Sequence, residues 1–305
     1  MKNIYSRTLE TTVTKPLIVL SVLIAILGEI LTESFGPNSY SGDYYSVISQ
    51  SLLAQHTVMF LLICGAWLMI MVISTSTGLI SSEVHEGTFR LLVAKPNTRK
   101  QILLAKIAGA FTGQVILLLL TIFVYYGALF FNAKMSAEIY KQMIHYMPGY
   151  ILYGITVIII FLGLSTLLSC IFRKKITAML PLIAVVVIMI AFFPIQRLIS
   201  GLSGKSLSAL ISLVDVNYHF GLIFKFYMNM FGGIYGKTER LEILAYLTNM
   251  FSSTRVDKDF IRESYSSSYV TDNNTLNMYA VTLTYLILSA LIYVGSFAII
   301  KKKDV

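Results

Sequence analysis

Six long runs of apolar residues constrain the fold of this 305-residue chain more than any other feature. A helix crosses the hydrocarbon core of a bilayer with about 20 mostly apolar residues. None of the runs alternates apolar and polar residues as a barrel strand would. The sequence therefore predicts an all-α integral membrane protein, a single transmembrane domain with six transmembrane helices. The runs cover residues 16–32, 57–80, 102–131, 148–172, 176–195 and 276–300.

The composition excludes the common soluble classes. Hydrophobic residues make up 56% and charged residues 13% of the chain, whereas soluble domains carry about 45–50% apolar and about 25% charged residues. A core of this size cannot bury that excess, which argues against a soluble enzyme, a disordered protein and a nucleic-acid-binding domain. The two cysteines, Cys64 and Cys170, both lie in apolar runs, so we expect small buried side chains rather than a disulfide or a metal site.

The distribution of lysine and arginine predicts the orientation. The N-terminal segment, the connection after the second run, the turn at 173–175 and the tail at 301–303 together hold 14 of the 24 basic residues. The opposite connection at 33–56 has none. Positive residues favour the cytoplasmic side, so we expect both termini in the cytoplasm. The net charge of +9 then reflects membrane topology and predicts membrane lipids, not nucleic acid, as the neighbouring molecules.

The segment 197–275 is too long to be a simple connection. A seventh span in its first part would place the basic tail outside, so we expect helices there that lie at the outer interface or dip partly into the membrane. Residues 241–247 show helical spacing of apolar positions, and 264–268 read as a serine-rich linker. Aromatic residues of the first part are candidate cargo contacts: Phe220, Phe224, Phe226, Tyr227 and Phe231.

The loop 81–101 carries the most informative pattern. A polar stretch ends at Gly87, Thr88 can cap a second short helix, and Pro96 can stop that helix. Composition alone favours a basic loop that merely obeys the positive-inside rule. The order of residues is more specific: Glu83, then Glu86-Gly87-Thr88, Leu91-Leu92, Pro96, Arg99 and Lys106.

This order resembles the signature loop of type-2 ABC exporter permeases. The resemblance implies a type-2 ABC exporter-like bundle whose loop 81–101 is a coupling helix that docks on a separate ATPase subunit. It also implies that the N-terminal segment 1–15 is a cytoplasmic interface, with a helix over 3–14 lying flat; its threonines favour a short one. By this resemblance the ATPase contacts are Glu83, Glu86, Gly87, Thr88, Phe89 and Arg90.

The energy source is expected on the partner. Gly204-Lys205-Ser206 looks like the end of a phosphate-binding loop, but the glycine which that motif needs is replaced by Ile199. We therefore expect a chain that is not an enzyme and binds no cofactor, with ATP and magnesium on the ATPase. Six spans are half of the usual complement of the family, which implies two ATPase copies and a second permease copy or a homologous permease.

Small residues share one face of the third run. Ala105, Gly109 and Gly113 follow each other at intervals of four residues, and such residues allow close helix packing in membranes. The pattern predicts a packing seam within the bundle or between two permease halves, although glycine is frequent enough in membrane helices for chance to explain it.

Two functions are consistent with these features. The first is the permease subunit of an ATP-driven exporter, a multi-pass protein of a bacterial cytoplasmic membrane. Its expected cargo is amphipathic or hydrophobic, such as an antimicrobial peptide, drug or lipid-like molecule. The second is a membrane sensor or immunity component that transports nothing and binds a peptide or lipid at its outer loops. The spans lack the paired groups that an intramembrane enzyme needs.

Overall fold

The structure is a computed structural model that describes residues 2–37, 44–88, 98–131, 135–202, 209–234, 247–255, 268–273 and 275–302. Most of the described residues are helical, and one pair of strands lies in the sequence between the helix that ends at Asn229 and the helix that begins at Met278. The elements up to the fourth span are α1 (Lys2–Thr12), α2 (Lys15–Phe35), α3 (Tyr44–Val58), η1 (Met59–Trp67), α4 (Leu68–Ser76), α5 (Ser81–His85), α7 (Arg99–Phe131), α8 (Ala137–His145) and α9 (Met147–Ile171). The remaining elements are α10 (Lys175–Val187), η2 (Ile188–Phe192), α11 (Phe193–Leu202), α12 (Ala209–Val214), α13 (Val216–Asn229), β1 (Phe251–Arg255), β2 (Ser268–Asp272) and α15 (Met278–Lys302).

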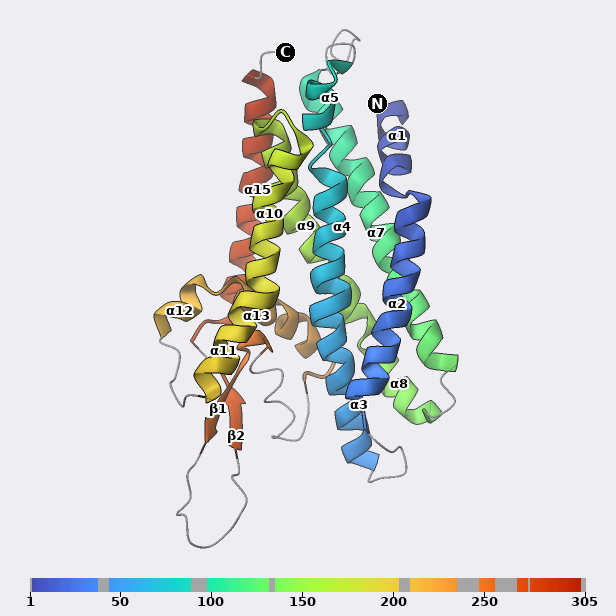
Figure 1. The fold of residues 1–305 in the computed structure, drawn as a ribbon, viewed down its shortest axis with the longest axis vertical. Coiled ribbons are helices and arrows are strands. Elements are labelled where there is room, and N and C mark those ends of the chain that lie inside the picture. Colours follow the sequence, from blue (N-terminus) through green and yellow to red (C-terminus); the bar gives the residue numbers. More distant parts are fainter. Residues whose placement is uncertain are drawn as a thin grey trace, which may run out of the picture.

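Six helical segments in the described parts of the chain are long and apolar enough to cross a membrane. This confirms the six spans expected from the apolar runs. They stand side by side along the long axis, and the two ends of the chain lie at the same end of the bundle (Figure 1). An even number of crossings requires that arrangement. The segments are Lys15–Phe35, Tyr44–His85, Arg99–Phe131, Ala137–Ile171, Lys175–Arg197 and Met278–Lys301.

The second span is longer than expected because it begins at Tyr44 rather than near Thr57. The extra turns of α3 pack against α2 and α8, and their side chains Leu52 and Leu53 are buried. Within the same span, nine residues (Met59–Trp67) form a π-helix, and η2 is a second, shorter one in the fifth span. The apolar pattern gives no sign of either, since a π-helix changes the hydrogen bonding and not the composition.

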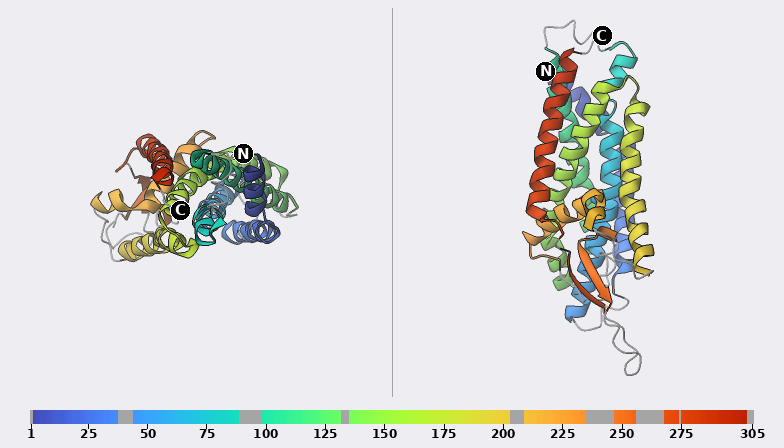
Figure 2. Two further views of the ribbon diagram at one scale, coloured as in Figure 1. Left: turned by 90° about the horizontal axis from the view of Figure 1, so that it is seen from above. Right: turned by 90° about the vertical axis from the view of Figure 1, so that its left-hand side faces the viewer.

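The interior is built around α9, which packs against α4, α7, α13 and α15. Seen from above, α2, α10 and α15 lie at the rim of the bundle (Figure 2). Their outward side chains are large and apolar, for example Leu23, Leu180 and Leu291 at 55%, 59% and 62% exposure. Such faces suit contact with lipid, in which apolar surface carries no penalty.

The segment after the fifth span differs from the expected picture. α13 packs against α9 and α15, and most of its side chains are buried, which favours the partly inserted alternative over an interfacial helix. Strands β1 and β2 pair antiparallel, with Phe251 opposite Asp272, at the end of the bundle away from the termini (Figure 1). These strands were not predicted, while most of 241–247 and of 264–268 lies outside the described residues.

The aromatic residues predicted as cargo contacts are buried or half-buried, and their contact with a cargo stays a prediction. Phe220 and Phe224 are 1% and 0% exposed because they sit in the core of the bundle. The ring of Phe226 contacts Tyr279 of α15, with centroids 5.5 Å apart. Tyr227 and Phe231, the latter just after α13, are half-buried. The Tyr227 hydroxyl hydrogen-bonds to Thr156 of α9 at 2.7 Å, and the ring of Phe231 lies against His145.

Candidate coupling site

The connection between α4 and α5 is fixed to α9 by a serine. The backbone N–H groups of Ile80 and Ser81 both donate to the Ser169 hydroxyl oxygen, at 2.9 and 3.0 Å. All three residues are fully buried. Because a helix start leaves backbone N–H groups without partners, this side chain satisfies two of them and ties α5 to the fourth span.

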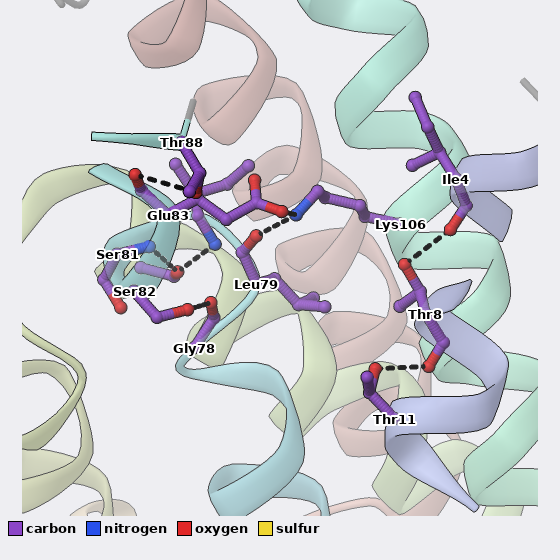
Figure 3. A network of polar contacts seen from close by, with 12 residues as sticks. Ile4, Thr8, Thr11, Gly78, Leu79, Ser81, Ser82, Glu83, Thr88 and Lys106 are labelled. Atoms are coloured by element: carbon purple, nitrogen blue, oxygen red, sulfur yellow. Dashed lines mark hydrogen bonds and ion pairs between the residues drawn. The ribbon is translucent and has the colours of Figure 1, made fainter. Parts of the chain in front are cut away.

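Lys106 of α7 holds the other side of the same connection. Its ammonium group lies 2.6 Å from Glu83 Oε1 and donates to the carbonyl oxygen of Leu79 at 2.6 Å. Figure 3 shows the lysine reaching across from α7 to both partners. Lys106 is 5% exposed, and a charge at that depth is stable only when it is paired. The pair therefore joins α5 to the third span.

The predicted docking residues differ in their surroundings. Glu83 is paired with Lys106, and its side chain is 24% exposed and lines the cleft described below, so its contact with the ATPase stays a prediction. The exposed residues at this tip, among those that the structure describes, are His85, Glu86, Gly87 and Thr88. Gly87 has φ +73°, the left-handed conformation that commonly ends a helix and that glycine adopts without strain. The predicted contacts Phe89 and Arg90 lie outside the described residues.

A cleft of about 600 Å³ separates α5 from α1 at this end of the bundle. Thr8 and Thr11 of α1 line one wall, as the view in Figure 3 makes clear. Charged side chains also line the cleft, namely Arg7, Glu83, Glu86, Lys106 and Lys175. A lining of hydroxyl and charged groups suits polar groups rather than lipid tails.

α1 packs closely against the small residues of α7. A Cβ atom on Gly109 would lie 2.7 Å from the carbonyl oxygen of Tyr5, and one on Gly113 would lie 2.8 Å from Thr12 Cβ. These contacts favour the packing seam within the bundle for these two glycines. Ala105 lies on the same helix and is 7% exposed.

The same contacts correct the expected orientation of the N-terminal helix. α1 covers eleven residues and meets α7 at successive levels, from Tyr5 near Gly109 to Thr12 near Gly113. It therefore runs along α7 instead of lying flat across the end of the bundle, as Figure 1 also shows. The threonine hydroxyls bond back to their own helix: Thr8 to the Ile4 oxygen and Thr12 to the Thr8 oxygen, both at 2.8 Å.

With this geometry established, comparison with known proteins decides the class. A family model described as ABC-2 family transporter protein matches residues 3–300. The chain belongs to the ABC-2 transporter family. A search of curated proteins finds no match. The ABC-2 chain is thus a multi-pass membrane transport subunit, and permeases of this family generally work with an ABC ATPase and are generally not catalytic themselves.

Sequence reasoning did not predict the contacts that Ser169 and Lys106 make in this site. Ser169 had no signal, since a serine in a membrane helix is ordinary. Lys106 did have one: it is a cation in the opening turns of an apolar run, and such a charge needs a partner. Among the described residues, no group of three or more histidine, cysteine, aspartate or glutamate side chains could hold a metal ion.

Proposed function

We propose that this ABC-2 permease is the membrane subunit of an ATP-driven exporter in a cytoplasmic membrane. The observation that supports this proposal most is the contrast between the tip and its helix. Residues Glu86–Thr88 are exposed, whereas α5 just before them is attached to two spans through Lys106 and Ser169. A partner that pushes on the tip would therefore move α7 and α9 rather than bend a loose loop.

The mechanism that fits this anchoring is alternating access. A separate ATPase would bind ATP and magnesium and close, and α5 would pass the displacement to the spans. The Lys106–Glu83 pair would pass this displacement from α5 to α7, because a buried ion pair keeps one geometry, whereas an exposed pair is easily broken. Two copies of the ATPase and a second permease, identical or homologous, would complete the transporter.

The cargo class is proposed from the interior of the bundle. Its largest buried side chains are aromatic or apolar, among them Tyr125, Tyr150, Phe161 and Phe220. Such an interior suits a hydrophobic or amphipathic cargo, for example an antimicrobial peptide, a drug or a lipid-like molecule. The alternative of a sensor that binds its ligand at exposed outer aromatics is less supported, because Phe220 and Phe224 are buried.

Association with the ATPase tests the docking site. The permease would be captured with its co-expressed ATPase, as wild type and with Glu86→Lys. We expect the charge reversal to weaken association about tenfold, the equivalent of about 1.4 kcal/mol. Glu138→Lys is the matched control, because Glu138 is an exposed acid in the first turn of α8, at the opposite end of the bundle (Figure 1). Equal association of both variants with the ATPase would refute the docking site.

A further inference from the structure

One aromatic ring of α13 is enclosed by rings of the spans. The centroid of Phe224 lies 5.1 Å from that of Tyr153, 5.4 Å from Phe60, and 6.0 Å from both His56 and Tyr150. These four rings, which we call the ring box, come from α3, η1 and α9. All five side chains are at most 2% exposed. A side chain from outside the six spans thus fills a compartment made by two of them.

The ring box carries hydrogen-bonding atoms that its packing does not satisfy. His56 Nδ1 is 2.7 Å from the Tyr150 hydroxyl. Among the described residues, however, neither His56 Nε2 nor the Tyr153 hydroxyl has a hydrogen-bond partner, although both atoms are buried. Leaving such a group unpaired costs about 1–3 kcal/mol, and a benzyl side chain such as that of Phe224 cannot offer a partner. A ring that carried a hydroxyl or N–H group could.

The backbone next to the ring box has an unusual, π-helical conformation. Phe60 belongs to the π-helix η1, which contacts both η2 and α9, and η2 contacts α13. π-Helical turns are rare and are found frequently at functional sites. Two of them meet here beside the helix that carries the enclosed ring.

α13 is a continuous helix that packs on α9 and α15 along its length and is followed by two glycines. At its start, Asp215 caps the helix by accepting from the Tyr218 N–H at 3.0 Å and pairs with Arg197 of α11. Just after its end, Gly232 and Gly233 have φ of +114° and +85°, conformations that glycine adopts without strain. A movement of α13 would draw Phe224 out of the ring box while the spans kept their places.

We infer that the ring box is a binding site for an aromatic group of the cargo that carries a hydrogen-bond donor, such as a phenol or an indole. Phe224 fills the site at rest, and α13 withdraws it when the cargo is handed over. The assignment of the ligand as cargo rests on the proposed function; the existence of the site does not.

Binding of small aromatic probes tests the site without the ATPase. Phe224→Ala empties the ring box. Phe220→Ala is the matched control, since it removes an equally large ring one turn earlier on α13 that is 1% exposed and packs on Phe161 and Tyr285. Binding of 4-fluorophenol and 4-fluorotoluene to each purified variant would be measured by fluorine NMR, and comparing variants with one probe cancels its partition into micelles.

We expect 4-fluorophenol to bind Phe224→Ala about tenfold more tightly than Phe220→Ala, the size of one net hydrogen bond, and 4-fluorotoluene to bind both variants equally. Adding His56→Leu to Phe224→Ala should reduce the phenol preference. If the two probes show the same ratio between the variants, the ring box is only a hydrophobic contact and the site is refuted.

The movement of α13 is tested in the complete transporter. Phe224→Cys and, as a control, Phe161→Cys of α9 would be made in a background without the two native cysteines, since both positions are buried. During ATP turnover we expect a thiol reagent to modify position 224 about tenfold faster than at rest, and position 161 at an unchanged rate. An unchanged rate at 224 during hydrolysis would refute the withdrawal of Phe224. Failure to find an associated ATPase would refute the proposed function, and the phenol result would still decide the site.

Discussion

Replacing Gly109 by alanine should loosen α1 from the bundle, because the added methyl group has no room. Its carbon would lie 2.7 Å from the Tyr5 carbonyl oxygen and 3.0 Å from Thr8 Cβ, whereas non-bonded carbon atoms prefer about 3.5–4.0 Å. α1 must therefore move away from α7 by several tenths of an ångström. Overpacking of this kind costs about 1–3 kcal/mol, which we expect to appear as a lower free energy of unfolding.

Gly127→Ala in the same helix isolates that cost. A Cβ atom at Gly127 meets nothing within 4 Å, so this variant has only the gain of about 1 kcal/mol that alanine brings to a helix. Unfolding by SDS titration in mixed micelles would measure both variants. We expect Gly109→Ala to be about 1–3 kcal/mol less stable than Gly127→Ala. A difference below about 0.5 kcal/mol, the usual scatter of such comparisons, would refute the close packing of α1.

Two further predictions concern the tip and the anchor. Lys106→Met should cost about 3 kcal/mol, because it leaves the partly buried Glu83 without its cation. Adding Glu83→Gln should recover part of that loss in a double-mutant cycle, and strict additivity of the two changes would show that the pair does not interact. In intact cells, a thiol reagent that cannot cross the membrane should leave Glu86→Cys unmodified and should label Tyr45→Cys, whose parent side chain is 79% exposed near the other end of the bundle. The reverse pattern would contradict the predicted orientation.

The spans could be predicted from the sequence because burial in a bilayer depends on composition over about 20 residues. Each of the six expected apolar runs coincides, to within two residues outside its bounds, with a helical segment of the structure that can cross a membrane. The family could also be predicted, since the residues around Glu86-Gly87-Thr88 keep a specific order.

The direction in which side chains face could not be predicted in the same way. The pairing of Glu83 with Lys106, which is 23 positions further along the chain, is an example. The insertion of α13 depends on its contacts with α9 and α15 and on the pair that joins Asp215 to Arg197. Each of these is a contact between distant segments, and local propensity or periodicity contains no information about it.

The helical N-terminal segment shows how such contacts override propensity. Thr8, Thr11 and Thr12 favour other conformations in isolation, yet α1 extends over eleven residues. Gly109 and Gly113 of α7 allow α1 to pack closely against that helix. Packing contributes more to helix stability in proteins than intrinsic propensity does.

Cross-linking from the tip of α5 tests the central claim most directly. A cysteine at Glu86, in a background without the native cysteines, would be treated with a short cysteine-to-lysine cross-linker in membranes that contain the co-expressed ATPase. We predict a covalent permease–ATPase product from this position and none from a cysteine at Glu138 at the opposite end. A product from position 138, or equal products from both positions, would contradict the account of α5 as the contact with the motor.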